Sequence, residues 1–190
     1  MLIIGITGTL GAGKGAIVDF LTKEKGFAHF SVRAFIAEEI IRRGMVVNRD
    51  SMVLVANDLR KNNSPSYIID RLYEKALALG QNGVIESIRT PGEVYSLRKK
   101  DGFYLIATDA DPMIRYGRIS LRQSETDNIS YQTFLDNEQR EMNSADPNAQ
   151  NIARCMEMAD YHLINNGTIE QLNHQVEKVL KEIQNKTLDD

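Results

Sequence analysis

The residues best suited to chemistry lie near the start of the chain, in the stretch GITGTLGAGKGAI at positions 5–17. Within it, Gly8-Thr9-Leu10-Gly11-Ala12-Gly13-Lys14 has the spacing G-x-x-x-x-G-K. Small residues let successive backbone N–H groups turn inward around a phosphate, and a following helix N-terminus adds positive potential. The spacing therefore predicts a phosphate-binding loop in which Lys14 reaches the β- and γ-phosphates. The alternative is a glycine-rich turn with Lys14 on a solvated helix start.

The residue after the lysine departs from the most common form of this loop. Most such loops place there a hydroxyl that binds Mg²⁺, whereas this chain has Gly15. The glycine pattern resembles that of adenylate kinases and related nucleoside monophosphate kinases, which carry G-x-x-G-x-G-K-G-T. Ala16 stands where that family has threonine, so one hydroxyl contact to the phosphates is missing. The resemblance implies that ATP and Mg²⁺ bind at residues 8–16.

A second group of candidates lies in Val84-Ile85-Glu86-Ser87-Ile88-Arg89-Thr90. Glu86 ends a predicted strand beside the loop strand, where open α/β sheets bind ligands, so it is a candidate for substrate binding and for holding Mg²⁺ through water. Arg89 is a candidate for gripping an acceptor phosphate with two hydrogen bonds. The segment resembles a variant of the Asp-Gly-x-Pro-Arg-Thr signature of adenylate kinases, one residue shorter and with glutamate for aspartate. The alternative is an ordinary ion pair between Glu86 and Arg89.

Three arginines follow the predicted fourth strand. Arg115, Arg118 and Arg122 stand at i, i+3 and i+7 and so share one helical face. Such a face suits a transferring phosphoryl group, whose charge is spread over several oxygens. The spacing of Arg118 and Arg122 is similar to that of the helix leading into the lid of adenylate kinases, which implies contacts with the donor and the transferred phosphate. We expect a short lid over 123–128; the alternative is a solvated face paired with Glu125.

The same resemblance implies two further contacts. Arg33 falls where similar kinases bind the acceptor monophosphate, and Asp58 and Arg60 are further candidates unless they face water. The ending of the last predicted strand resembles that of monophosphate kinases and dephospho-coenzyme A kinases, so Asn166 and Gly167 are expected beside the donor adenine. Asn-Gly is also an ordinary turn.

Short apolar runs and capping residues indicate the elements that hold these groups. All four prolines follow a residue able to cap a helix, which predicts helix starts at Ser64-Pro65, Thr90-Pro91, Asp111-Pro112 and Asp146-Pro147. Strands and helices alternate, which indicates right-handed crossovers and a parallel sheet covered on both faces. We therefore predict an α/β chain with the three-layer fold of P-loop NTPases, a five-stranded parallel sheet and a small lid. The strands are expected over 2–7, 28–31, 83–87, 103–108 and 161–164.

Length and composition set the remaining bounds. With 190 residues, we expect one domain over 1–184, with acceptor-binding helices at about 33–79 and a lid at about 115–142, followed by a flexible tail over 185–190. The net charge of -3 weighs against a nucleic-acid binder. No apolar run approaches the length of a membrane span, and the single Cys155 fits a reducing cytosol. We expect a cytoplasmic protein with a small-molecule nucleotide partner and no membrane partner; the oligomeric state does not follow from the sequence.

Together these features predict a nucleotide kinase. It would move the γ-phosphoryl group of ATP to a nucleoside or deoxynucleoside monophosphate, with no covalent protein intermediate. Catalysis by Lys14, Arg89, Arg118 and Arg122 would consist mainly of positioning and electrostatic stabilisation.

Two alternatives stay open. Dephospho-coenzyme A is a second possible acceptor, suggested by the ending at 165–168, although the Asp-rich acceptor signature common in such kinases is absent at Ser31-Val32-Arg33. From another class, the protein would be a nucleotide-binding regulatory protein, in which Gly15, Ala16 and Glu86 permit binding with little transfer.

Overall fold

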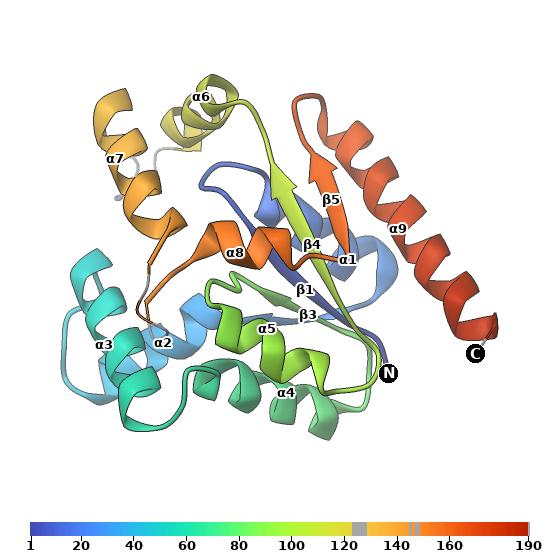
Figure 1. Cartoon of the computed structure of the whole chain (residues 1–190), viewed down its shortest axis with the longest axis horizontal. Helices are drawn as coiled ribbons and strands as arrows, with labels where there is room; N and C mark the ends of the chain where they lie inside the picture. The colour runs from blue at the N-terminus through green and yellow to red at the C-terminus, as the bar shows by residue number, and fades with distance from the viewer. Residues whose placement is uncertain (123–128, 145, 147–148, 190) are drawn as a thin grey trace.

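The centre of the molecule is a sheet of five parallel strands in the order β2-β3-β1-β4-β5 (Figure 1). The structure is a computed structural model that describes the chain except for residues 123–128, 145, 147–148 and 190. The expected α/β class with a five-stranded parallel sheet is confirmed. The strands are β1 (Ile3–Gly8), β2 (Ala28–Ser31), β3 (Gly83–Glu86), β4 (Phe103–Asp109) and β5 (Tyr161–Ile164).

The central strand β1 is buried along its whole length, as is typical of a parallel sheet covered on both faces. Its register pairs Gly8 with Thr108 of β4, while Ser31 of β2 pairs with Glu86 of β3. The carboxyl ends of these strands therefore meet at one edge of the sheet, which is where open α/β sheets bind ligands.

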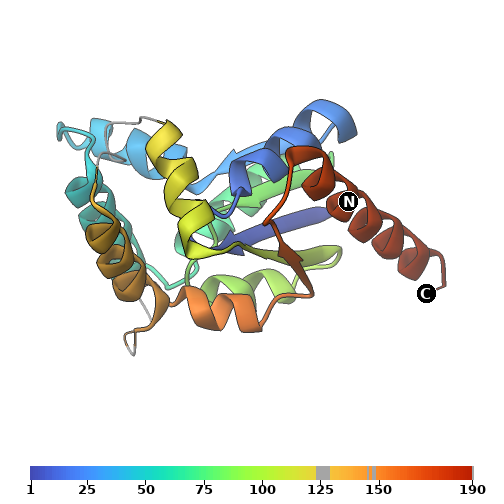
Figure 2. The same cartoon turned by 90° about the horizontal axis from the view of Figure 1, so that it is seen from above.

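Helices cover both faces of the sheet and bury two separate apolar clusters. On one face, α1 and α9 contribute Ile17, Leu21 and Val176 to the first cluster. On the other, α2, α3, α4, α5 and α8 surround a cluster that includes Ile69 and Leu97. Figure 2 shows α1 and the α5–α8 pair on opposite sides of the sheet. The helices are α1 (Lys14–Lys25), α2 (Val32–Arg42), α3 (Arg49–Asn62), α4 (Tyr67–Leu79), α5 (Pro91–Arg98), α6 (Pro112–Arg122), α7 (Tyr131–Met142), α8 (Ile152–Glu157) and α9 (Ile169–Asp189).

The capping residues predict some helix starts and miss others. Helix α5 begins at Pro91, with a capping box between Thr90 and Glu93, and α6 begins at Pro112. The start expected at Pro65 is wrong, because α4 begins two residues later at Tyr67. The start expected at Pro147 lies outside the described residues, and α8 begins at Ile152 with the Asn151 side chain as its cap.

The flexibility expected over 185–190 stays a prediction, although residues up to Asp189 belong to a helix. Helix α9 continues to Asp189, since the sequence has no glycine or proline to end it after Ile169. Leu180 and Ile183, one turn apart, pack into the apolar cluster that α9 shares with α1, and they hold this part of the helix against the sheet.

Candidate phosphate-binding site

The loop between β1 and α1 has a conformation that only glycine adopts easily. Gly8, Gly11 and Gly13 have φ values of 137°, 80° and 100°, all in the region that side chains disfavour. Space is equally short, since a Cβ on Gly8 would lie 2.0 Å from the Thr108 carbonyl oxygen and one on Gly13 would lie 2.3 Å from the Asn165 amide nitrogen. The loop leads directly into the N-terminus of α1, so its backbone has the geometry of an anion site.

Lys14, the first residue of α1, turns its ammonium back over this loop. Its Nζ donates hydrogen bonds to the carbonyl oxygens of Gly8 (2.8 Å) and Thr9 (2.7 Å). Removal from water and then the positive charge of Arg89 lower its pKa from 10.5 to about 7, while the Glu141 and Glu86 carboxylates act in the opposite sense. An ammonium that has lost its hydration gains strongly from an arriving phosphate.

Two side chains that the sequence analysis did not identify hold the loop in place. The Asp109 carboxylate, at the end of β4, accepts a hydrogen bond from the Thr9 hydroxyl at 2.5 Å. The buried Asn165 amide donates to the Ala12 carbonyl oxygen at 2.9 Å. Both residues end strands of the sheet or follow them directly, and a polar residue at that position was the signal that could have identified them.

Gly15 and Ala16 form the first turn of α1. A Cβ on Gly15 would meet no atom within 4 Å, so the protein itself does not require glycine there. Ala16 is partly buried and packs against the cluster beneath α1. Leu10, at the tip of the loop, is held through its carbonyl oxygen, which accepts a hydrogen bond from Arg115 at 3.1 Å.

Glu86 lies at the carboxyl end of β3 and binds residues of the neighbouring strand. Its Oε1 accepts a hydrogen bond from the Ser31 hydroxyl at 2.9 Å and lies 3.3 Å from the His29 Nε2. The alternative in which Glu86 pairs with Arg89 is wrong, because Arg89 pairs with Glu141 instead. His29, which from the sequence has no role at the site, therefore touches a candidate site residue.

The donor set around Glu86 suits a cation that is held chiefly by phosphates. In the part of the chain that the structure describes, no group of three or more Asp, Glu, His or Cys side chains is placed to hold a metal ion. Mg²⁺ in phosphoryl-transfer sites is usually bound by one or two carboxylates together with substrate phosphates and water. A single carboxylate near Lys14 fits that arrangement.

Arg89 projects from the loop after β3 toward helix α7. Its Nη1 donates to the Glu141 Oε2 at 2.9 Å and to the Gln150 Oε1 at 2.7 Å. Glu141 and Arg89 both act on the pKa of Lys14, so these three groups share one electrostatic environment. The sequence analysis identified the arginine but neither of its partners.

The three arginines of α6 do not act as one face. Arg115 is 3% exposed and pairs with Glu138 at 2.9 Å, so it is part of the interior support of the loop. Arg118 donates to the carbonyl oxygens of Asn165 (2.9 Å) and Gly167 (3.2 Å). Arg122 is exposed at the end of the helix. Their surroundings and partners differ because α6 runs past different neighbours.

The turn after β5 is tied to both α6 and the loop. The Asn166 carboxamide oxygen accepts a hydrogen bond from the backbone N–H of Asp111 at 2.8 Å. The Gly167 carbonyl oxygen accepts one from Arg118, and a Cβ on Gly167 would lie 1.8 Å from the Gln171 Oε1. The structure thus brings Asn166, Gly167 and Arg118 together. The expected lid over 123–128 lies outside the described residues.

The acceptor candidates do not all share one location. Arg33 is exposed in the first turn of α2. Arg60 is buried and pairs with Glu93, so the interpretation of Arg60 as an acceptor contact is wrong. Asp58 pairs with Arg43 across the α2–α3 junction. The polar sequence of α3 gave no sign that Arg60 is buried.

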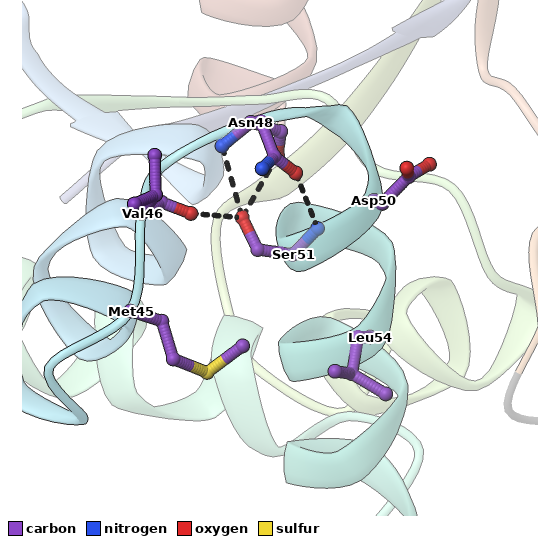
Figure 3. Close-up of a pocket in the computed structure, with 6 residues that line it drawn as sticks. All are labelled: Met45, Val46, Asn48, Asp50, Ser51 and Leu54. Atoms are coloured by element: carbon purple, nitrogen blue, oxygen red, sulfur yellow. Dashed lines mark hydrogen bonds between the residues drawn. The ribbon is translucent and has the colours of Figure 1, made fainter.

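An open hollow of about 600 Å³ lies at the start of α3, within the segment expected to bind the acceptor. Figure 3 shows its lining, with Met45 coming from the segment before α3 and Leu54 from α3 itself. The Ser51 hydroxyl donates to the Val46 carbonyl oxygen at 2.7 Å, and the Asn48 side chain caps the helix. The hollow therefore has an apolar surface with polar groups along one side.

No helix among the described residues has both the length and the apolar character needed to cross a membrane.

A family model described as an AAA domain matches residues 4–146. The UPF0200 protein of Methanococcus vannielii is 30% identical over 186 residues, covering 96% of this chain and 97% of the relative.

Solved structures share the fold at lower identity. TT1252 from Thermus thermophilus has a TM-score of 0.60 and 21% identity, covering 95% of this chain and 97% of the other. A gluconokinase from Sinorhizobium meliloti has a TM-score of 0.61 and 11% identity, covering 100% of this chain and 97% of the other. At these identities the likeness concerns the fold alone, which is P-loop kinase-like.

Proposed function

We infer a function from the premise that the chain belongs to the AAA-domain family and to the UPF0200 proteins. We propose that it is an ATP-dependent kinase that transfers the γ-phosphoryl group to a nucleoside or deoxynucleoside monophosphate. The observation that carries the proposal is the ammonium of Lys14, held over a glycine loop at a helix N-terminus with Arg89 close enough to affect its pKa. Two cations beside an anion site suit the charge that develops in phosphoryl transfer.

In the proposed reaction the loop N–H groups of residues 8–16 and Lys14 hold the donor phosphates. The bond between the γ-phosphorus and the ADP oxygen breaks as an oxygen of the acceptor bonds to the same phosphorus, and ADP leaves with the electron pair. Arg89 and Arg122 would neutralise the reacting oxygens, and Arg118 would act with Asn166 at the adenine side. Mg²⁺, when bound, would shield the donor phosphates, with Glu86 holding it through water.

The acceptor is proposed to bind in the segment 33–79, with Arg33 and Arg89 on its phosphate. The hollow beside α3 supports this proposal, since Met45, Val46 and Leu54 give the kind of apolar surface on which a nucleobase packs. Glu86 would then act at both substrates, because it lies at the edge of the sheet where donor and acceptor would meet.

A second acceptor class is favoured by one observation. Glu86, at the end of β3, lies beside Ser31 at the end of β2 and His29 within the same strand. A carboxylate so placed suits an acceptor hydroxyl, which must lose a proton as it reacts. Dephospho-coenzyme A, which accepts through a hydroxyl, is therefore retained as the alternative.

The test is ADP release from Mg²⁺·ATP with a panel of ribonucleoside and deoxyribonucleoside monophosphates and dephospho-coenzyme A. Lys14→Ala should abolish turnover, at a cost of at least about 1,000-fold. The matched control is Lys23→Ala, since Lys23 lies on the same helix with an exposed side chain that pairs only at the surface with Asp19.

Three outcomes are informative. Lys14-dependent stimulation by one acceptor supports the kinase and names its substrate. Full turnover by Lys14→Ala contradicts the proposed roles. Tight ATP binding with no stimulation by any acceptor favours a nucleotide-binding regulatory protein.

A further inference from the structure

An ion pair removed from water joins helix α3 to the start of helix α5. The side chains of Arg60 and Glu93 are 3% and 0% exposed, and the Arg60 Nη2 lies 2.9 Å from the Glu93 Oε1. The Arg60 Nε donates to the same oxygen at 3.3 Å. Buried ion pairs are costly to form, and removing one partner leaves a charge in the interior without its counterpart, so the position of each group depends strongly on the other.

The second oxygen of the same carboxylate holds the backbone of a proposed catalytic residue. The Glu93 Oε2 accepts hydrogen bonds from the backbone N–H groups of Arg89 (2.8 Å) and Thr90 (3.1 Å). On its other side, the Arg89 carbonyl oxygen accepts a hydrogen bond from the Asn151 N–H at 2.8 Å. The peptide groups on both sides of the Arg89 Cα are therefore fixed. The Glu93 carboxylate accepts from the N–H of each, and Asn151, the N-cap residue of α8, donates to the carbonyl oxygen of the second.

From these contacts we propose that Arg60 is a positioning residue for Arg89. Arg60 holds one oxygen of Glu93 so that the other oxygen fixes the Arg89 backbone, and this directs the guanidinium toward the site. The inference rests on the proposed function for the role of Arg89 in phosphoryl transfer, but the chain of contacts stands without it. Arg60 itself does not touch a substrate.

The chain of contacts from Arg60 through Glu93 to the Arg89 backbone, called the relay below, matters because Arg89 must be placed accurately. Its guanidinium is held by Glu141 and Gln150 at 2.9 and 2.7 Å, and a phosphate would have to replace these partners. Catalytic groups displaced by about 1 Å lose much of their effect, on the order of 100-fold in rate. Because Arg60 belongs to α3, the relay also connects the segment proposed to bind the acceptor with the arginine proposed to bind the transferred group.

The test uses the full chain with Arg60→Met and Arg60→Lys, and Arg154→Met as the matched control. Arg154 also forms an arginine–glutamate pair, with Glu157, but both side chains are more than half exposed. The first readout is amide hydrogen exchange at Arg89 and Thr90, which requires no activity. We expect exchange at these two amides to rise at least about tenfold in Arg60→Met, partial recovery in Arg60→Lys, and no change in Arg154→Met.

The second readout separates binding from turnover. The loop that holds ATP is not part of the relay, so the Kd for ATP should stay within about threefold of the wild-type value, while kcat with the active acceptor falls at least about tenfold in Arg60→Met. All measurements are made well below the melting temperature of each variant. If Arg60→Met does not fold, Arg60→Lys carries both readouts with smaller changes.

Two results would overturn the inference. Wild-type exchange at Arg89 and Thr90 in the variants would show that Arg60 does not fix this backbone. Faster exchange with unchanged kcat would show that the contact is structural only. Absence of turnover by the wild-type protein itself would count against the proposed function, whereas the exchange measurement would still decide whether Arg60 positions Arg89.

Discussion

We expect the ammonium of Lys14 to make the affinity for ATP, the proposed donor, depend on pH in a direction that follows from the structure. In the empty loop, removal from water and then the charge of Arg89 lower the pKa of Lys14 to about 7. A triphosphate on the loop places negative charge against the same group, so the pKa rises in the complex. Above about pH 7, binding must therefore be accompanied by proton uptake, and the affinity falls as the pH rises.

The size of the effect comes from the two pKa values. With a pKa of about 7 in the free protein and a pKa raised beyond the assay range in the complex, the Kd rises nearly tenfold per pH unit, or about 20-fold between pH 7.5 and pH 9. At about pH 8, each ATP bound takes up about 0.9 proton. The phosphates of ATP are already ionised in this range and contribute little to the change.

Isothermal titration calorimetry in buffers of different ionisation enthalpy measures both the Kd and the number of protons taken up. Lys14→Arg is the matched control, because a guanidinium stays charged throughout this range and its affinity for ATP should not vary with pH in the same way. Zero proton uptake by the wild-type protein, or an equal slope in Lys14→Arg, would refute the argument. It would mean that Lys14 keeps its charge in the empty loop.

Three further predictions concern the support of the site. Gly8→Ala should lower the melting temperature by at least about 10 °C, because the new Cβ would lie 2.0 Å from a carbonyl oxygen of β4. In Gly15→Ala the new Cβ would enter open space, so the melting temperature should change by less than about 2 °C. Equal melting curves for the two variants would contradict this prediction. Asn165→Ala removes the hydrogen bond to the Ala12 carbonyl oxygen and should weaken ATP binding about tenfold by calorimetry, so an unchanged Kd would exclude a role for Asn165 in shaping the loop. Burial raises the pKa of the Cys155 thiol to about 12, so a disulfide reagent at about pH 8 should label it only after unfolding, and rapid labelling of the folded protein would be inconsistent with that burial.

The sheet and the glycine loop were predictable because their signals are local. Buried apolar runs such as β1 and the spacing from Gly8 to Lys14 depend on neighbouring residues alone, and the strand limits agree with prediction to within a residue. The start of α5 was predictable because Thr90 forms a side-chain cap directly before Pro91. Helix starts were not predictable where the chain makes a further turn first, as after Pro65.

The partners of the charged residues were not predictable, because they come from distant parts of the chain. Arg89 meets Glu141 across 52 positions, and Asn165 meets Ala12 across 153. Arg60 stands in a polar helical stretch that gives no sign of burial, and its partner Glu93 lies 33 positions away in the sequence. Sequence periodicity gives the face of a helix but not what that face meets.

Helix α7 carries Glu138 and Glu141, one turn apart, and each holds an arginine beside the phosphate loop. These two carboxylates neutralise the two arginines in the protein itself, so the arginines do not repel each other as unpaired cations would. A phosphate that reaches Arg89 replaces a carboxylate there, and this contact is an exchange of anions with little change in net charge. The dependence of ligand affinity on salt concentration should consequently be shallower than the number of nearby cations suggests.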